Sequence, residues 1–81
     1  MKLYILCQSE NVGYDTYDSA VVAAKSEDDA RKIHASGDDD HWKHDWNHTW
    51  ADKPEQVDVE LIGTALRGTK RGVVLASFNA G

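Results

Sequence analysis

Two groups of side chains in this sequence have the types and spacing that suit ligand binding. The first repeats a tyrosine-aspartate pair at an interval of three, in a segment entered through Gly13: Tyr14, Asp15, Tyr17 and Asp18. Phenol rings stack or donate hydrogen bonds, and carboxylates accept them from ribose hydroxyls or base edges, as is typical of small-ligand sites. The alternative is turn chemistry, with the carboxylates capping backbone N–H groups and the rings lying over a sheet edge.

The second group is the basic stretch from residue 67 to residue 72. It places two glycines among four side chains that could contact an anion: Arg67, Thr69, Lys70 and Arg71. Glycines let backbone N–H groups approach an anion, while the basic side chains supply charge and the threonine a further donor. The spacing of a Walker motif is absent, and the alternative is a charged turn that serves only solubility. We expect both groups to line one hollow, within a chain or across subunits, that binds a small nucleotide-like ligand.

A third unusual stretch, residues 38–54, reads DDDHWKHDWNHTWADKP. On a helix its aromatic residues would form one stripe and its histidines the opposite side: Trp42, Trp46, Trp50 and His41, His44, His48. We expect at least two tryptophans to pack in the core and Trp46 to offer a surface for stacking on a nucleobase. The alternative is an irregular loop, because Asp, Asn, His and Thr are mediocre helix formers.

The histidines also raise the question of a metal site. His44 and His48 have the i, i+4 spacing that can chelate one ion, with Asp45 or Asp52 adding oxygen. Along a helix, however, the first and last histidine of the stretch lie about 10.5 Å apart, so all three cannot easily reach one ion. We therefore expect solvated histidines, and no metal or other cofactor.

Catalytic groups have little support in this sequence. The single cysteine, Cys7, sits in an apolar run, which predicts a buried thiol in a reducing compartment. His34, beside Ile33 on a predicted helix, is read as a core residue, and the few serines lie in no recognisable nucleophile setting. The sequence favours a binding protein over an enzyme.

Length and charge narrow the class further. The 81 residues suit one domain spanning the whole chain, and the net charge is −5. All fourteen acids lie between Glu10 and Glu60, whereas residues 61–81 hold three basic residues and no acid. The acidic total argues against nonspecific binding to duplex DNA. The apolar runs are too short to span a bilayer and the N-terminus lacks a signal-peptide pattern, so a cytoplasmic protein is expected.

Hydrophobic patterning predicts an α+β fold. We expect strands over 2–8, 20–25, 57–66 and 73–78, and a helix over 27–35 with Ser26 as N-cap and Gly37 as the stop. The last two strands are expected to form a hairpin around the basic turn. The economical architecture is a four-stranded antiparallel sheet packed by one helix, with the Trp/His-rich stretch as an insert. The second sheet face, bearing residues such as Tyr4 and Leu6, would stay uncovered as a dimer or ligand face, and homo-oligomerisation would support so short a chain.

Three stretches, GYDTYDSAVVAAKSEDDARKIH (13–34), VDVELIGTA (57–65) and GVVLASFNAG (72–81), resemble small uncharacterised proteins carried by bacteriophages and prophages. The resemblance brings no catalytic motif. It implies a phage accessory protein that acts in the bacterial cytoplasm and counteracts host defence. Such a protein would act as a sponge for a nucleotide immune signal or as a stoichiometric inhibitor of a host defence protein.

The acidic band from residue 38 to residue 60 supports the second of these functions. It contains eight acids and two lysines. Because complementary charge steers association, this band could cover a nucleic-acid-binding surface of a host factor. The acidic inhibitor is thus the alternative to the nucleotide sponge.

Overall fold

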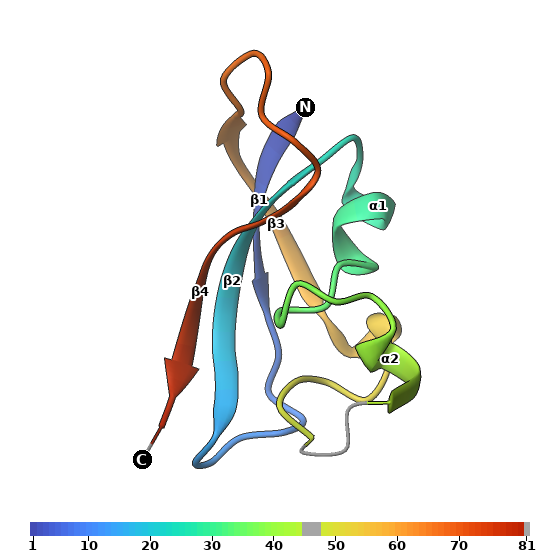
Figure 1. Cartoon of the computed structure of the whole chain (residues 1–81), viewed down its shortest axis with the longest axis vertical. Coiled ribbons are helices and arrows are strands. Elements are labelled where there is room, and N and C mark those ends of the chain that lie inside the picture. The colour runs from blue at the N-terminus through green and yellow to red at the C-terminus, as the bar shows by residue number, and fades with distance from the viewer. Residues whose placement is uncertain (45–47, 81) are drawn as a thin grey trace.

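The computed structural model describes residues 1–44 and 48–80, which form one antiparallel sheet with short helices and irregular chain on one face (Figure 1). The sheet order is β3-β1-β2-β4, and each neighbouring pair is antiparallel. This confirms the expected four-stranded α+β architecture. The elements in chain order are β1 (Lys2–Cys7), β2 (Thr16–Ala24), α1 (Glu27–Arg31), α2 (His41–His44), the 3-10 helix η1 (Pro54–Gln56), β3 (Asp58–Thr64) and β4 (Gly72–Asn79).

The predicted hairpin between the last two strands is wrong. β3 and β4 lie at opposite edges of the sheet, and residues 65–71 cross one end of it over the central pair β1 and β2 (Figure 1). Near the start of this crossover the Ala65 N–H donates to the Met1 carbonyl. Three inter-strand spacings total about 14 Å, which a connection of this length spans easily. A short basic segment is therefore as compatible with a crossover as with a hairpin turn.

Helix α1 begins as the sequence predicts and ends earlier. The Ser26 Oγ accepts a hydrogen bond from the Asp29 N–H at 3.1 Å, the expected N-cap contact. The helix stops at Arg31, not at residue 35. Beyond it the chain turns so that Ile33 and His34 are both buried, and the His34 Nδ1 accepts the Ser36 N–H at 3.1 Å. His34 is therefore a core residue, as expected, although it lies outside the helix.

The core lies between the sheet and the helical layer. Tyr4 and Leu6 point into it with residues of β2 and the buried Trp50. The prediction that these two residues mark the uncovered face is thus wrong. On β1 every residue from Leu3 to Cys7 is compatible with burial, so alternation alone could not tell which face the helix would cover. The opposite face carries Leu3 and Ile5, which pair with Ala23 and Val21 of β2.

Cys7 lies on that opposite face and is exposed, so the prediction of a buried thiol is also wrong. Its register partners are Ser19 and Asp58. Partial burial raises the pKa of the thiol, and the carboxylates of Asp58 and Glu60 raise it further. A thiol with a raised pKa carries little thiolate at neutral pH, which makes it a weak nucleophile.

The Trp/His-rich stretch is not one helix in its described part. Helix α2 covers only His41–His44, and His48 has a positive φ of 50°. Trp50 is 1% exposed in the core, and the half-buried Trp42 packs beside it with its Nε1 donating to the Lys32 carbonyl at 2.7 Å. Within the described residues, Trp50 belongs to the core cluster and Trp42 packs against that cluster. Trp46 and Asp45 lie outside the described residues.

The histidines of this stretch have different surroundings. His41 is half-buried with its Nδ1 2.8 Å from the Ser36 Oγ, whereas His48 is exposed with its Nδ1 3.9 Å from an Asp52 carboxylate oxygen. Within residues 1–44 and 48–80, no three His, Cys, Asp or Glu side chains lie close enough together to hold a metal ion. In the same ranges, no helix has the length and apolar character needed to cross a bilayer.

Candidate functional site

A hollow lies at the end of the sheet where β1 begins. It has a volume of about 470 Å³ and is lined by Met1, Lys2, Lys25 and Thr64. The strand register explains this grouping, because Lys2 pairs with Ala24 at the end of β2 and with Thr64 at the end of β3. Three strand ends therefore bring two lysines and the N-terminal residue Met1 to one place.

The crossover brings further positive charge to this same end, which we call the basic end. It leaves β3 at Thr64, and Arg67 and Lys70 on it are exposed. A turn between Leu66 and Thr69, closed by the Thr69 N–H donating to the Leu66 carbonyl at 3.0 Å, sets the course of the crossover. The positive φ of 91° at Gly68, inside this turn, is a conformation that glycine adopts readily. Three of the four predicted anion-contacting residues, Arg67, Thr69 and Lys70, thus lie at the end of the sheet that holds the hollow.

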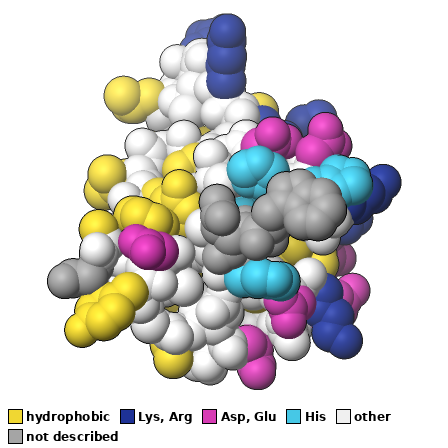
Figure 2. Space-filling view, turned by 60° about the horizontal axis from the view of Figure 1, so that its bottom comes forward, with side chains coloured by type: hydrophobic (Ala, Val, Ile, Leu, Met, Phe, Trp, Pro, Cys, Tyr) yellow, Lys and Arg dark blue, Asp and Glu magenta, His cyan; other side chains and the backbone are white. Residues whose placement is uncertain are grey.

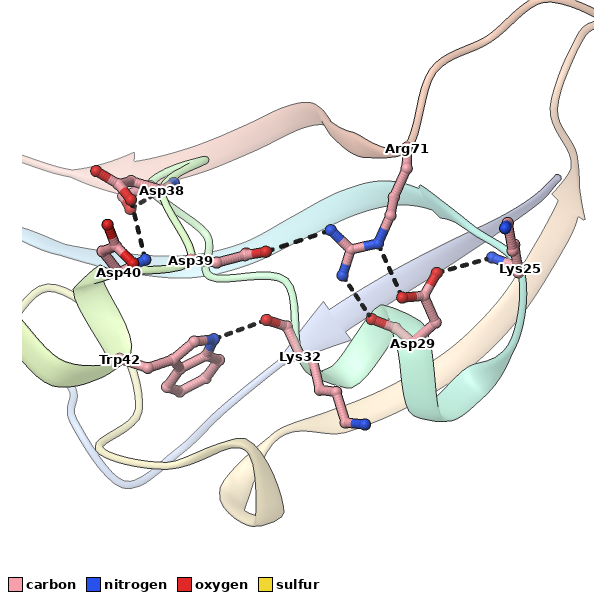
Figure 3. Close-up of polar contacts among 9 residues, drawn as sticks. Lys25, Asp29, Lys32, Asp38, Asp39, Asp40, Trp42 and Arg71 are labelled. Carbon is pink, nitrogen blue, oxygen red and sulfur yellow. Dashed lines mark hydrogen bonds and ion pairs between the residues drawn. The ribbon is translucent and has the colours of Figure 1, made fainter.

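Arg71 has a different role. Its Nε lies 2.8 Å from an Asp29 carboxylate oxygen and its Nη1 lies 3.3 Å from Asp39, so the guanidinium is held between α1 and the segment before α2 (Figure 3). These contacts, the hydrogen bond to Asp29 foremost, raise the pKa of Arg71. Arg71 therefore fastens the start of β4 to the helical layer, and its charge is already largely matched by acids.

The same contacts make stability depend on pH. Burial raises the pKa of Asp29, but the hydrogen bond from the Lys25 N–H and the Arg71 guanidinium outweigh burial and hold it below its ordinary value. Because the folded-state pKa is the lower one, Asp29 adds stability at neutral pH that is lost as the pH falls below about 4. Solvent screens this partly exposed pair, so its contribution is about 0.5–1 kcal/mol.

We expect Asp29→Asn to lower the urea midpoint at pH 7 and to differ much less from the parent protein at pH 3. Asp28→Asn is the matched control, because the Asp28 side chain is 88% exposed and pairs with Arg31 on its own helix. A deficit of Asp29→Asn that is the same at both pH values would contradict the role given to this carboxylate.

The tyrosine-aspartate pairs lie around the start of β2, and only part of this segment is a loop. Tyr17 and Asp18 belong to β2, although a loop was expected there. The Tyr17 ring packs against Phe78 of β4 with 4.8 Å between centroids. Tyr14 is 75% exposed, and Asp15 has a positive φ of 59° while its N–H donates to the Asn79 carbonyl. This region, the tyrosine end, is therefore an exposed aromatic surface supported by the C-terminal strand.

The two predicted halves of the site do not meet within one chain. Thr16 pairs with Asn79 at the tyrosine end, whereas Ala23 pairs with Gly72 at the basic end. A nine-residue strand such as β2 places its ends about 26 Å apart. The expectation of one hollow lined by both groups in a single chain is wrong, because β2 and β4 run the full length of the sheet between them.

Sequence reasoning missed Lys2 and Lys25. The signal was present: each is a lysine at the end of a predicted strand, and an antiparallel pair places the start of one strand beside the end of the other.

Comparisons with family models, curated proteins and solved structures found no significant match to this chain. The candidate function therefore depends on the geometry of the two ends and on the distribution of charge.

Proposed function

We propose that this chain is a binding protein without catalytic activity, and that it holds a small phosphate-bearing, nucleotide-type ligand at the basic end. The hollow lined by Lys2, Lys25, Met1 and Thr64 carries the proposal. Its volume falls within the roughly 300–1,000 Å³ of small-molecule sites. Phosphate oxygens form charge-assisted hydrogen bonds with ammonium groups, and these are stronger than neutral ones. Arg67 and Lys70 on the crossover add attraction for an anion.

The proposed setting is the bacterial cytoplasm during phage infection. The resemblance to phage accessory proteins supports it. In this setting the protein sequesters a nucleotide immune signal stoichiometrically. Such a sponge must bind the nucleotide and be present in an amount that matches it, but it does not need to convert the nucleotide chemically.

Isothermal titration against AMP, ADP-ribose, cyclic di-AMP and inorganic pyrophosphate tests the proposal. We expect at least one of these probes to bind, with an affinity that falls as salt rises. The double variant Lys2→Gln/Lys25→Gln should bind that probe about 10- to 100-fold more weakly, because it loses two charge-assisted contacts. The double variant Lys43→Gln/Lys53→Gln removes the same number of charges from two exposed lysines that do not line the hollow, and it is the charge-matched control. If none of the probes gives a heat of binding or a thermal shift, the proposal is overturned.

A second candidate function is supported by where the negative charge lies. Residues 25–57, which connect β2 to β3, hold nine acids and five basic residues, while the rest of the chain holds five acids and four basic residues. The connection that covers the sheet therefore carries four of the five net negative charges. Figure 2 shows acidic side chains gathered on this side around the histidines. Such a surface is complementary to a basic, nucleic-acid-binding surface of a host defence protein.

A pull-down from bacterial lysate at low and high salt tests this second function. A partner that is retained at low salt and released at high salt supports an acidic inhibitor, because screening weakens attraction between surface charges. Retention that is unchanged by salt, or no partner at all, counts against it.

A further inference from the structure

Strand β4 is an edge strand with an unusually apolar surface. Within the described residues only β2 pairs with it, so its outer edge presents free backbone N–H and C=O groups. Leu75 is 69% exposed, and Val74 and Phe78 are about half exposed. In Figure 2 hydrophobic side chains gather on the side of the molecule where Figure 1 places β4. A free edge with apolar side chains is a template on which another strand can pair.

A second copy of this chain suits the edge of β4 by charge. β4 begins at the basic end and finishes at the tyrosine end. If two copies of β4 pair antiparallel about a twofold axis, the basic end of each copy comes beside the tyrosine end of the other. Arg67 and Lys70 of one subunit then face the exposed carboxylates of Asp15 and Asp18 of its partner. The same arrangement occurs twice, so the attraction is doubled.

The regular part of β4 sets the register of this pairing. β4 has one extra residue relative to β2, Val74, and none from Leu75 to Asn79, while β2 has its own extra residue, Asp18, between the partners of Phe78 and Ser77. A bulge discourages pairing, so the axis falls at the middle of the regular part, at Ser77. Counting along the strands then places Thr16 of the partner subunit level with Leu75, and Tyr14 lies in the turn just before it. From the partner's β2 to β1, which carries Lys2 of the hollow, there are four inter-strand spacings, about 19 Å. The lysine and tyrosine side chains and an extended ligand such as ADP-ribose span this separation together.

We infer that two copies of this chain pair through β4 and that each basic hollow is completed by the tyrosines of the partner subunit. The phosphates of the ligand bind at the basic end of one subunit, and its base stacks on Tyr14 of the other. The ligand part of this inference rests on the proposed function, whereas the pairing of β4 does not. It explains why one chain carries two ligand-type surfaces that it cannot itself bring together.

Light scattering after gel filtration tests the pairing without any ligand. We expect a mass twice the 9.0 kDa of the chain. The double variant Leu75→Lys/Ser77→Lys should raise the dimer dissociation constant at least about tenfold, because it places like charges across the axis and removes apolar contact. Leu61→Lys/Ile62→Lys is the matched control on the other edge, since both side chains are about half exposed on β3. A monomeric parent protein, or equal weakening by both variants, overturns the pairing.

Mixing two variants tests the shared site. Lys2→Gln/Lys25→Gln removes the lysine charges from the basic end, and Tyr14→Ala removes the stacking ring from the tyrosine end. Neither variant alone therefore forms a complete site. In an equimolar mixture half of the dimers combine both variants and have one intact site, which restores about one quarter of the sites. ADP-ribose is the probe, and pyrophosphate is the control. Because pyrophosphate has no base to stack on Tyr14, its affinity should be unchanged by Tyr14→Ala.

The outcomes separate this inference from the proposed function. Restored binding of ADP-ribose in the mixture supports the shared site. A dimer in which mixing restores nothing overturns the shared site, even where ADP-ribose binds the parent protein. A monomer that binds pyrophosphate overturns the pairing and leaves the proposed function standing, whereas a dimer that binds none of the probes leaves the pairing and removes the proposed function.

Discussion

Replacement of Trp50 by alanine is expected to lower the free energy of unfolding by about 3–5 kcal/mol, as for other large buried aromatic side chains. Trp50 is 1% exposed and belongs to the same core cluster as Tyr4, Leu6 and Ile33. It comes from irregular chain, so the segment around it has no helix or strand of its own to keep it folded. Its indole joins this segment to the sheet.

The loss is large for a chain of this length. At about 0.05–0.15 kcal/mol per residue, 81 residues give a total stability of roughly 4–12 kcal/mol. Trp50→Ala should therefore lower the melting temperature by more than about 12 °C, or prevent folding at 37 °C. Urea unfolding followed by far-UV circular dichroism measures the difference.

Trp50→Phe distinguishes the contribution of the aromatic ring to stability from that of the indole N–H group. The Trp50 Nε1 is buried and has no hydrogen-bond partner within the described residues. Phenylalanine keeps most of the apolar contact and removes this donor, so it should cost clearly less than alanine. A cost below about 1 kcal/mol for Trp50→Ala would show that the indole does not organise the core, since buried aromatic residues normally cost several times more.

Local features were predictable from the sequence where a local interaction decides them. Ser26 was recognisable as a cap because its hydroxyl can reach the N–H three residues on, whatever the rest of the chain does. The end of α1 was less predictable. The helix ends after Arg31, although Ala30, Ile33 and His34 would share one face of a continuing helix, so the apolar pattern alone did not locate its end.

Features set by the order of strands were not predictable from local patterns. The basic stretch has the glycines of a hairpin turn, yet it crosses the sheet, because β1 and β2 already pair with each other and leave only their outer edges to β3 and β4. Because β3 runs antiparallel to β1, the chain leaves β3 at the end of the sheet opposite the β1–β2 loop, and this separates Arg67 from Tyr14 by the length of the sheet. The strand order leaves β4 at an edge, on which the inferred dimer depends.

Asn11→Asp is expected to be the most damaging substitution outside the apolar core. The Asn11 side chain donates through Nδ2 to the carbonyls of His48 and Trp50, the latter at 3.0 Å. Its backbone N–H donates to the Gln8 Oε1 at 2.8 Å, and the Gln8 Nε2 donates back to the Asn11 carbonyl. These bonds tie the loop after β1 to the segment that carries Trp50.

A carboxylate at position 11 has nearly the same shape but no hydrogen to donate. Two carbonyls then lose their donor and face a negative charge, so we expect Asn11→Asp to cost about 2–4 kcal/mol at neutral pH. Asn11→Ala removes the donor without adding charge and should cost less. The deficit of Asn11→Asp should shrink in acid, because a protonated carboxyl regains one donor. Urea unfolding at pH 7 and pH 3.5 measures both effects.

Ser9→Asp is the control for added charge in the same loop. Ser9 is exposed, so a carboxylate there should change stability by less than about 0.5 kcal/mol. Near-UV circular dichroism adds a second measurement, because the signal of a buried indole depends on its fixed surroundings. If Asn11→Asp unfolds the protein no more easily than Ser9→Asp, then Trp50 is held by its own packing alone. In that case the polar link between β1 and the Trp50 segment contributes nothing to the fold.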